Sequence, residues 1–422
     1  MSTAFGLDFG TTNSVLAIAQ DGLVEIADID PFSQSKKTLK SVIFFDEDKN
    51  PSVGEKAIEQ YIEFGGSYGR FMQSIKAFLP DRNFTETFVF GKRFEIEDLV
   101  SLILKEIKHR GELQVGHVVD TVVLGRPVVF SEDRENDLLA EERLRTAALK
   151  AGFLNIHFLY EPIAATLAYE STLKENEEKL VFMGDFGGGT SDFVIMRLRG
   201  GKHDPKASRK QDILSVGGVY VGGDSFDSAL MWHKVARHFG RDTKHKSVTG
   251  QELDMPVWIP RTLCQWHLIP RLRDKKTLET IRSIKTTADD RQSIQNLEEL
   301  ILGNLGYMIF RSIEQAKCVL SDQNLSQITF SEGGIAIKES IDRAEFEGLS
   351  AEEIAKIGNC ANETLLRSGV PTKAIDLVLL TGGSSFIPVV QQIFTEKFGK
   401  AKMYPIDAFT SVAYGLGLYA SM

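Results

Sequence analysis

The chain has few cysteines and no long hydrophobic run. Its 422 residues contain only three cysteines, Cys264, Cys318 and Cys360, which lie far apart. So small a number excludes a disulfide framework and favours a reduced, cytoplasmic compartment. No apolar stretch approaches the roughly 20 residues of a membrane-spanning helix, and residues 5–8 (Phe-Gly-Leu-Asp) do not form the apolar core of a secretion signal. We therefore expect a cytoplasmic protein that does not enter a membrane.

Positive charge and the signatures of several common sites are also lacking. The net charge of −9 argues against nucleic acid as a partner. Cys264 and His267 have Cys-x-x-His spacing without a second pair at ligand spacing, so we expect no zinc site. The absence of Gly-Lys-Ser and Gly-Lys-Thr excludes a P-loop. A dinucleotide fingerprint needs a helix directly after its glycines, whereas residues 191–196 have the composition of a strand.

One motif is present twice. Residues 8–14 read Asp-Phe-Gly-Thr-Thr-Asn-Ser, and residues 185–191 read Asp-Phe-Gly-Gly-Gly-Thr-Ser. Each copy lies between two apolar runs of strand character, which predicts strand, glycine-rich turn, strand in both places. Two ordinary hairpin turns would explain the glycines as well. A matched pair of this kind instead favours one polyphosphate held between two halves of the protein.

The residue types of the motif suit a phosphate group. Glycine allows a ligand to approach the main chain closely, and successive backbone N–H groups form a concavity that binds anions. Thr11, Thr12 and Thr190 add hydroxyl donors. Asp8 and Asp185 would repel a bare phosphate, so their presence indicates a cation, and Mg²⁺ held through water by carboxylates is the usual solution.

The rest of the chain alternates strand and helix patterns. Apolar residues at helical spacing predict helices at 99–109, 133–151, 162–169, 305–321 and 389–398. Residues 350–353, Ser-Ala-Glu-Glu, have the pattern of a capping box that opens a further helix ending at Gly369. Residues 240–300 are polar and rich in proline and tryptophan, and they are expected to form an insertion with some helices.

Four other features have an ordinary structural explanation beside a functional one. Lys76 lies between apolar residues, although most lysines are simply solvated. Glu161 precedes Pro162, where a carboxylate suits a helix start. Glu314, Lys317 and Ser321 share one helix face, which an exposed face with one ion pair would also explain. Residues 382–383 form either a tight strand-to-helix loop or a backbone contact for a nucleoside.

Taken together and in order, these residues resemble the ATPase region of the 70-kDa heat-shock chaperones (DnaK type), within the actin-like and sugar-kinase superfamily. Residues 6–14 and 185–192 resemble the two phosphate loops of that family, and Lys76 falls at its catalytic lysine. Arg126-Pro127-Val128 is similar to the segment with the switch proline, and residues 160–165 are similar to Asn-Glu-Pro-Thr-Ala-Ala. Residues 222–227, 314–321 and 381–388 are similar to the remaining nucleotide-binding segments.

The resemblance implies a role for each matching residue. Asp8, Glu161 and Asp185 would reach Mg²⁺ through water, Lys76 and Asp185 would position the attacking water, and Asp192 would be a second carboxylate. Thr11, Thr12 and Thr190 would hold the β- and γ-phosphates of ATP or ADP. The expected nucleotide contacts also include Gly10, Asn13, Gly187, Gly188, Gly189, Gly222, Gly223, Asp224, Glu314, Lys317, Ser321, Gly382, Gly383, Ser384 and Phe386.

The resemblance also implies the architecture. We expect an α/β protein with the actin-like ATPase fold, in which two ribonuclease-H-like lobes enclose a nucleotide cleft. Lobe I would comprise residues 1–177 with a subdomain inserted at about 37–105, and lobe II residues 178–422 with one at about 227–320. The peptide clamp and helical lid that follow this region in the chaperones have no counterpart in these residues, so the likeness is to the short, clamp-less YegD-type branch.

Three departures from the family pattern are visible. Cys318 and Phe386 stand where the family often has the arginines that stack on adenine, and Phe409 stands near its usual acidic residue. Residues 240–300 do not follow the family pattern. The first hypothesis is a slow ATPase of chaperone type, with protein clients or co-chaperones as candidate partners. The alternatives are a small-molecule kinase of the same superfamily and a non-catalytic, nucleotide-switched binding or filament protein.

Overall fold

The structure is a computed structural model that describes residues 3–64, 69–201, 209–247 and 249–421. Its internal contacts divide the chain into two compact units. Unit 1 comprises residues 1–59, 70–223 and 355–422, and unit 2 comprises residues 60–69 and 224–354. These two units have other bounds than the lobes and inserted subdomains expected from the sequence. The lobes and subdomains stay predictions.

The first motif lies in a mixed sheet of unit 1. The strand order is β11-β10-β1-β2-β3, and β4 also pairs with β2. β1 is parallel to β10 and antiparallel to β2, and β10 is parallel to β11. The strands are β1 Thr3–Phe9, β2 Asn13–Gln20, β3 Leu23–Ile26, β4 Leu39–Lys40, β10 Thr121–Arg126 and β11 Asn155–Tyr160.

The second motif lies in another sheet of unit 1, which repeats this connectivity. Its order is β14-β13-β12-β19-β20, with β12 antiparallel to β13 and parallel to β19. The strands are β12 Glu178–Phe186, β13 Ser191–Arg199, β14 Ile213–Val219, β19 Leu377–Thr381 and β20 Met403–Pro405. β12 therefore occupies the place that β1 has in the first sheet, and the repeat seen in the sequence extends to whole sheets.

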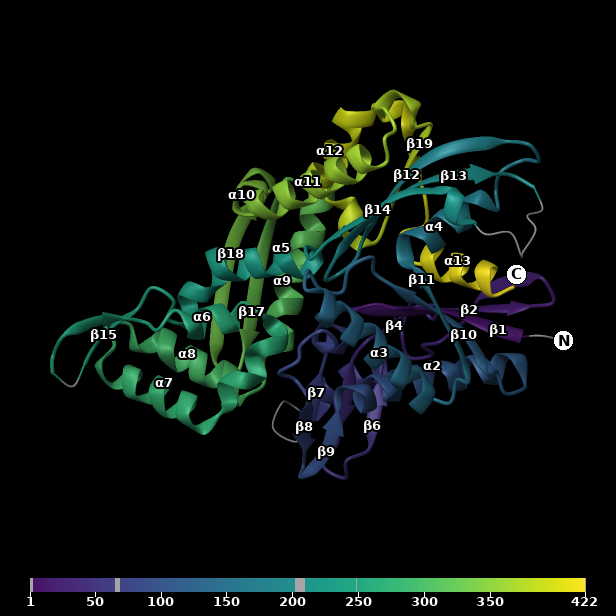
Figure 1. The fold of residues 1–422 in the computed structure, drawn as a ribbon. Helices are drawn as coiled ribbons and strands as arrows, with labels where there is room; N and C mark the ends of the chain where they lie inside the picture. The colour runs from purple at the N-terminus through teal and green to yellow at the C-terminus, as the bar shows by residue number, and fades with distance from the viewer. Residues whose placement is uncertain (1–2, 65–68, 202–208, 248, 422) are drawn as a thin grey trace. The chain divides into compact units, whose positions relative to one another are not determined.

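Two helices connect these sheets (Figure 1). Helix α13 (Ser411–Ala420) packs on β1 and β2, helix α4 (Glu161–Glu170) packs on β12 and β13, and the two helices pack on each other. Glycine makes this close approach possible, because a Cβ on Gly415 would lie 1.7 Å from the Ala164 carbonyl oxygen. A Cβ on Gly6 would likewise lie 2.2 Å from the Gly417 nitrogen. The core between the sheets is apolar and includes Val181, Met183 and Leu416.

The other elements of unit 1 include two long helices and two small sheets. Helices α2 and α3 supply apolar faces to a core that also contains Phe5, Leu7 and Phe153. The small sheets have the orders β6-β5-β7 and β8-β9. The bounds are β5 Ile43–Phe45, β6 Pro51–Val53, β7 Arg70–Met72, η1 Ile75–Phe78, β8 Glu86–Val89, β9 Lys92–Glu95, α2 Ile96–Val115, α3 Arg134–Lys150, η2 Arg209–Gln211, η6 Thr372–Ala374, η7 Gly383–Phe386, α12 Pro388–Phe398 and η8 Lys400–Lys402.

Unit 2 combines helices with two hairpins. Its longer hairpin, β17–β18, alternates buried and exposed residues, so one face packs inward, where it contacts helix α9. The elements are α5 Gly223–Leu230, η3 Met231–Val235, η4 Ala236–Phe239, β15 Lys244–Lys246, β16 Glu252–Asp254, α6 Trp258–Leu263, η5 Trp266–Arg273, α7 Lys275–Thr287, α8 Arg291–Leu302, α9 Gly306–Asp322, β17 Leu325–Glu332, β18 Ile335–Asp342 and α10 Arg343–Leu349. The chain passes between the units within α1 (Glu55–Phe64), before β7, at the start of α5 and near the start of α11 (Ala351–Arg367).

The predicted helices and strands are confirmed, although α2 (Ile96–Val115) is much longer than the predicted 99–109, but the capping box at residues 350–353 is wrong. Helix α11 does begin at Ala351, yet the Ser350 hydroxyl is buried without a hydrogen-bond partner. Ser350 also ends helix α10, where its φ of −106° and ψ of 13° differ from the extended conformation of an N-cap. The preceding helix therefore fixes the backbone of Ser350.

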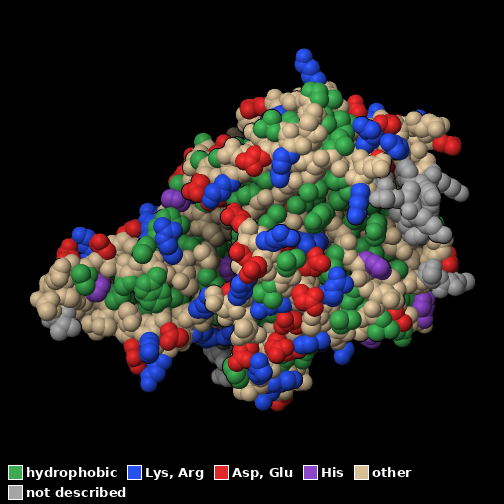
Figure 2. Space-filling model, in the orientation of Figure 1, with side chains coloured by type: hydrophobic (Ala, Val, Ile, Leu, Met, Phe, Trp, Pro, Cys, Tyr) green, Lys and Arg blue, Asp and Glu red, His purple; other side chains and the backbone are tan. Residues whose placement is uncertain are grey.

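The surface is mixed in charge. On the described part of the face shown in Figure 2, lysine and arginine side chains are interspersed with aspartate and glutamate. Among the described residues, no helix combines the length and the apolar character needed to cross a membrane.

Candidate functional site

The two repeated motifs form the same turn. In the hairpins β1–β2 and β12–β13, Asp8 pairs with Val15 and Asp185 pairs with Asp192. The Gly10 N–H donates to the Asn13 carbonyl at 3.0 Å, and the Gly187 N–H donates to the Thr190 carbonyl at 2.9 Å. Both copies are thus hairpin turns, one of the two explanations that the sequence left open. Each turn, however, begins at an aspartate whose pKa is raised.

The structure brings several of the predicted glycines to the second turn. A Cβ on Gly189 would lie 3.5 Å from the Thr11 hydroxyl, so the two turns approach each other. A Cβ on Gly222 would lie 2.5 Å from the Gly188 carbonyl oxygen. Gly382 has a φ of +81°, and its Cβ would lie 2.2 Å from the Phe186 carbonyl oxygen. Glycine is required at both positions because the backbones touch.

Lys76 and Glu161 form a buried ion pair. The Lys76 ammonium lies 2.8 Å from Glu161 Oε1, and the lysine side chain is only 8% exposed. Lys76 is carried by η1, which follows Ser74 in the left-handed conformation (φ 44°). Glu161 starts α4, and its side chain passes Gly125, whose Cβ would lie 3.1 Å from Glu161 Cγ. Lys76 is therefore not a solvated lysine, and Glu161 is not only a helix cap.

Three further carboxylates surround this pair. Burial, followed by repulsion from Glu161, raises the pKa of Asp8 to about 7. The same two causes raise the pKa of Asp185 well above its ordinary value. For Lys76 burial acts to lower the pKa, but attraction to Glu161 and Asp8 outweighs it, and the pKa is raised. Lys76 therefore stays charged among carboxylates that do not all ionise easily.

Asp192 connects the second turn to the segment after β10. Its two oxygens accept hydrogen bonds from the Thr190 hydroxyl and the Val128 N–H, both at 2.7 Å. Arg126, two residues earlier, stacks on Phe130 and Tyr160 at 5.0 and 5.3 Å. The sequence pointed to residues 126–128 only through the family resemblance. Nothing in it signals that Phe130 also lies 5.9 Å from the Lys76 ammonium.

The composition of this group fits a magnesium ion. Asp8, Glu161, Asp185 and Asp192 are four carboxylates, and Lys76 is the cation that acts on the pKa of each aspartate. The uncompensated negative charge and the hard oxygen donors match the preference of Mg²⁺. No three carboxylates or imidazoles within the described ranges are arranged to hold a metal directly. Contact of Mg²⁺ with these carboxylates through water stays a prediction.

The raised pKa values predict that the metal-free protein becomes more stable as pH falls. Asp8 and Asp192 each have a pKa of about 7 in the folded protein, above the usual aspartate value, so the folded state binds protons more tightly than the unfolded chain. Unfolding free energy should therefore rise between pH 8 and pH 6, by about 1 kcal/mol for each group. Urea unfolding in EDTA measures this change.

The variant Asp8→Asn should lose part of that pH dependence. The matched control is Asp48→Asn, which changes an exposed aspartate and should keep the full pH dependence. An equal pH dependence in wild type and Asp8→Asn would contradict the raised pKa.

Unit 2 contains a second charged group. Lys317 is buried, and its ammonium lies 2.8 Å from Asp227 Oδ2. The alternative that Glu314, Lys317 and Ser321 lie on an exposed helix face is therefore wrong for Lys317. Burial raises the pKa of Asp227 to about 6 and that of Asp224 to about 7, and Glu314 contributes to both. Ser321 lies one turn beyond Lys317, and its carbonyl oxygen accepts a hydrogen bond from Arg343.

Two members of this second group were not identified from the sequence. Asp227 is the partner of Lys317, and its other oxygen, Oδ1, is buried without a hydrogen bond. The Trp266 indole donates a hydrogen bond to Asp224. Asp227 could have been found from its place in the Gly-Gly-Asp-Ser-Phe-Asp run, whereas no local pattern pointed to Trp266.

The loop after β19 presents an aromatic side chain. Ser384 is buried, and Phe386 is 50% exposed. The ring of Phe386 lies 6.4 Å from that of Phe409, which is 51% exposed. Phe386 and Phe409, both noted in the sequence as departures from the family pattern, are thus neighbours in space.

Comparison with known proteins supplies the family. The model of the Hsp70 protein family matches residues 4–253 and 306–422, which leaves out a stretch that contains Trp266. The chaperone protein dnaK1 of Prochlorococcus marinus subsp. pastoris is 26% identical over 93% of this chain and 52% of its own length. The DnaK chaperones of Thermosipho melanesiensis and Thermosipho africanus are each 25% identical over 99% of this chain and 59% and 58% of their own.

The chain therefore spans little more than half the length of these curated relatives. The family match covers most of the chain and includes both repeated turns, Lys76 and Glu161. On this ground the chain belongs to the Hsp70 protein family.

Proposed function

We propose that this protein binds ATP with Mg²⁺ and hydrolyses it slowly, as a chaperone-like member of its family. The observation that carries the proposal is the buried ion pair of Lys76 and Glu161 among Asp8, Asp185 and Asp192. A charged lysine held beside carboxylates, next to two glycine-rich turns, suits phosphoryl transfer to water, in which positioning and charge neutralisation supply most of the catalysis.

Family membership supports the coarse part of this proposal. Hsp70 proteins have the actin-like ATPase fold, bind ATP and ADP, usually with Mg²⁺, and include ATPases of the DnaK type. We further propose two lobes with a nucleotide cleft, a likeness to the YegD-type branch without a peptide-binding domain, and a cytoplasmic location. Protein clients or co-chaperones would be its partners.

The residues of unit 1 would hold the phosphates and the water. Backbone N–H groups of the two turns would bind the phosphate oxygens, with Thr11, Thr12 and Thr190 as hydroxyl donors. Asp8 and Asp185 would hold Mg²⁺ through water, and the ion would neutralise charge on the phosphates. Lys76, fixed by Glu161 at 2.8 Å, would position the attacking water, and Asp185 would orient it. Asp192 would keep Thr190 in place through its 2.7 Å hydrogen bond.

The nucleoside would be held by other segments. We assign the ribose and base to the α9 residues Glu314, Lys317 and Ser321, and to the loop at residues 382–386. Phe386 is half exposed and offers an aromatic face to the base, in place of the arginine frequent in the family. Gly222, Gly223 and Asp224 would line the path between sugar and phosphates.

Two other functions remain as alternatives. A small-molecule kinase would need a base aimed at an acceptor hydroxyl, and the Lys76–Glu161 pair with its Glu-Pro-Ile-Ala-Ala helix start favours water as acceptor. A non-catalytic nucleotide switch would not need Lys76 buried among carboxylates. ATP turnover stimulated strongly by one sugar or acid would establish the kinase.

The proposal is tested by measuring ATP binding and phosphate release for wild type and Asp185→Asn. We expect both proteins to bind Mg-ATP and only wild type to release phosphate at a measurable rate, with EDTA abolishing it. Binding without release above the Asp185→Asn background would establish the nucleotide switch instead.

A further inference from the structure

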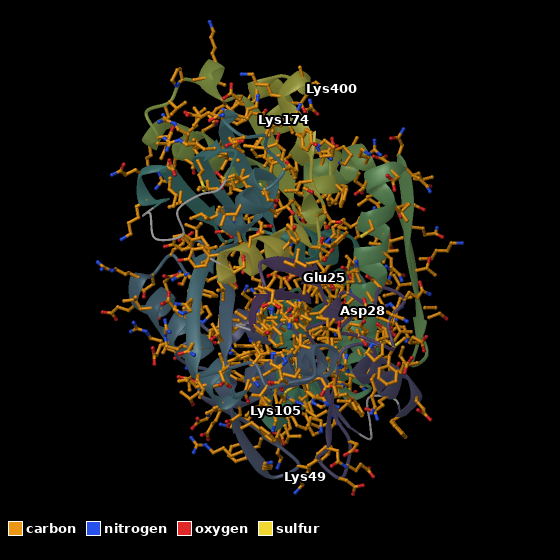
Figure 3. All side chains as sticks on the ribbon, turned by 90° about the vertical axis from the view of Figure 1, so that its right-hand side faces the viewer. Glu25, Asp28, Lys49, Lys105, Lys174 and Lys400 are labelled. Atoms are coloured by element: carbon orange, nitrogen blue, oxygen red, sulfur yellow. The ribbon has the colours of Figure 1, made fainter. Side chains whose placement is uncertain are left out.

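Unit 1 contains a hollow whose lining shares no residue with the candidate nucleotide site. It is a cavity of about 570 Å³ bounded by β6, the first turn of α1 and the middle of α2. We call it the α2 pocket. Its volume lies within the roughly 300–1,000 Å³ of pockets that bind small molecules. Lys105, on its α2 side, is labelled in Figure 3 below Glu25 and Asp28.

The acidic side chains of the α2 pocket are already neutralised. Glu112 pairs with Lys108 and also accepts the Val119 N–H at 2.9 Å. Glu106 accepts a hydrogen bond from Arg110 Nε at 2.8 Å. Each carboxylate on the lining thus has a basic partner, although Arg110 also pairs with Asp30.

The remaining lining carries positive charge. Lys56 on α1 and Lys105 on α2 are exposed side chains, and within the described ranges neither forms an ion pair. His109 lies one turn after Lys105 and adds a ring N–H donor. The chain has a net charge of −9, so two lysines without a carboxylate partner make this pocket positive in an otherwise acidic protein. Such a site attracts a compact anion.

The lining also has apolar surface and fixed walls. Val53 and Ala151 are buried, and Leu102 is partly buried, so part of the wall is apolar. The wall is held by Asp30, which is fully buried and accepts the Glu55 N–H of α1 at 2.9 Å. Asp30 also lies 3.5 Å from Arg110 on α2, which fixes α1 against α2. The pocket is therefore pre-formed, and binding would order little of the protein.

We propose that the α2 pocket binds a small organic dianion, with a phosphate-type group between Lys56 and Lys105 and an apolar body against Leu102 and Val53. Two uncompensated charges match a dianion, and the apolar wall distinguishes an organic phosphate from inorganic phosphate. This site would be separate from the ATP site and would be occupied whether or not nucleotide is bound.

The test uses 1-naphthyl phosphate as a fluorescent probe on the full chain, with excess ADP and Mg²⁺ to occupy the nucleotide site. We expect saturable binding of one probe per chain that weakens at least tenfold in the double variant Lys56→Gln, Lys105→Gln. The matched control Lys150→Gln changes an exposed lysine outside the lining and should leave probe binding unchanged. 1-Naphthol and inorganic phosphate should each bind at least tenfold more weakly than the probe.

Several results would overturn the proposal. Displacement of the probe by ADP with Mg²⁺ would assign it to the nucleotide site. Equal binding to wild type and to the double variant, with both shown to be folded by circular dichroism, would exclude the two lysines. Equal affinity for 1-naphthol would remove the anion requirement, and binding of polyglutamate in place of the probe would identify an acidic-peptide surface instead.

Discussion

Lys76→Ala is expected to lower the rate of phosphate release about 100-fold while ATP binding changes little. The lysine lies 2.8 Å from Glu161 and stays charged among buried carboxylates. In the proposed reaction its charge acts on the attacking water and the developing negative charge, more than on the bound nucleotide. Single-turnover phosphate release and equilibrium binding of a fluorescent ATP analogue separate the two effects.

The control for this variant is Lys150→Ala. Lys150 also lies close to two carboxylates, Glu95 and Asp98, at 3.4 and 2.7 Å, but it is about one-third exposed and has no part in the proposed reaction. Its removal should leave the rate unchanged. A Lys76→Ala protein that binds ATP and releases phosphate at the wild-type rate would refute the assigned role.

Gly415→Ala is expected to destabilise the protein by about 3 kcal/mol or more. The new methyl group would lie 1.7 Å from the Ala164 carbonyl oxygen, which belongs to the backbone of α4 and has no rotamer to yield. Because α13 and α4 contact strands of both sheets, a shift between them disturbs the packing around both turns. Urea unfolding, followed by circular dichroism, measures the loss.

A second helix glycine provides the matched comparison. A methyl group on Gly358 of α11 would meet only Ile393, at an ordinary 3.9 Å. Gly358→Ala should therefore keep or raise stability by about 0.5–1 kcal/mol, since alanine is the better helix former. Equal stability of the two variants would show that the contact between α13 and α4 is looser than the structure indicates.

Local patterns predicted the elements that carry the candidate site. The two motifs predicted strand, turn and strand at Asp8 and Asp185, and these became hairpins of the same register. Helical spacing located α3, α4, α9 and α12 to within a few residues. Such patterns succeed because periodicity and turn residues depend on neighbours within one or two turns of chain.

Other features depend on neighbours distant in sequence. The capping box at Ser350 failed because the preceding helix fixes its backbone. The partnership of Lys317 with Asp227 spans 90 residues, and that of Lys76 with Glu161 spans 85. The single-sequence pattern could not decide whether these lysines are solvated, because burial is set by other elements.

By itself, the sequence determined the repeated glycine-rich turn, the scarcity of cysteine, and the order of the segments that resemble the family. Only the tertiary structure decided that Lys76 and Glu161 form a buried pair, that Phe386 and Phe409 adjoin, and that Lys56 and Lys105 line one pocket. The physical reason is that charge and burial act through space. A pKa or a pocket is created by groups that the fold brings within a few ångströms of each other, whatever their separation along the chain.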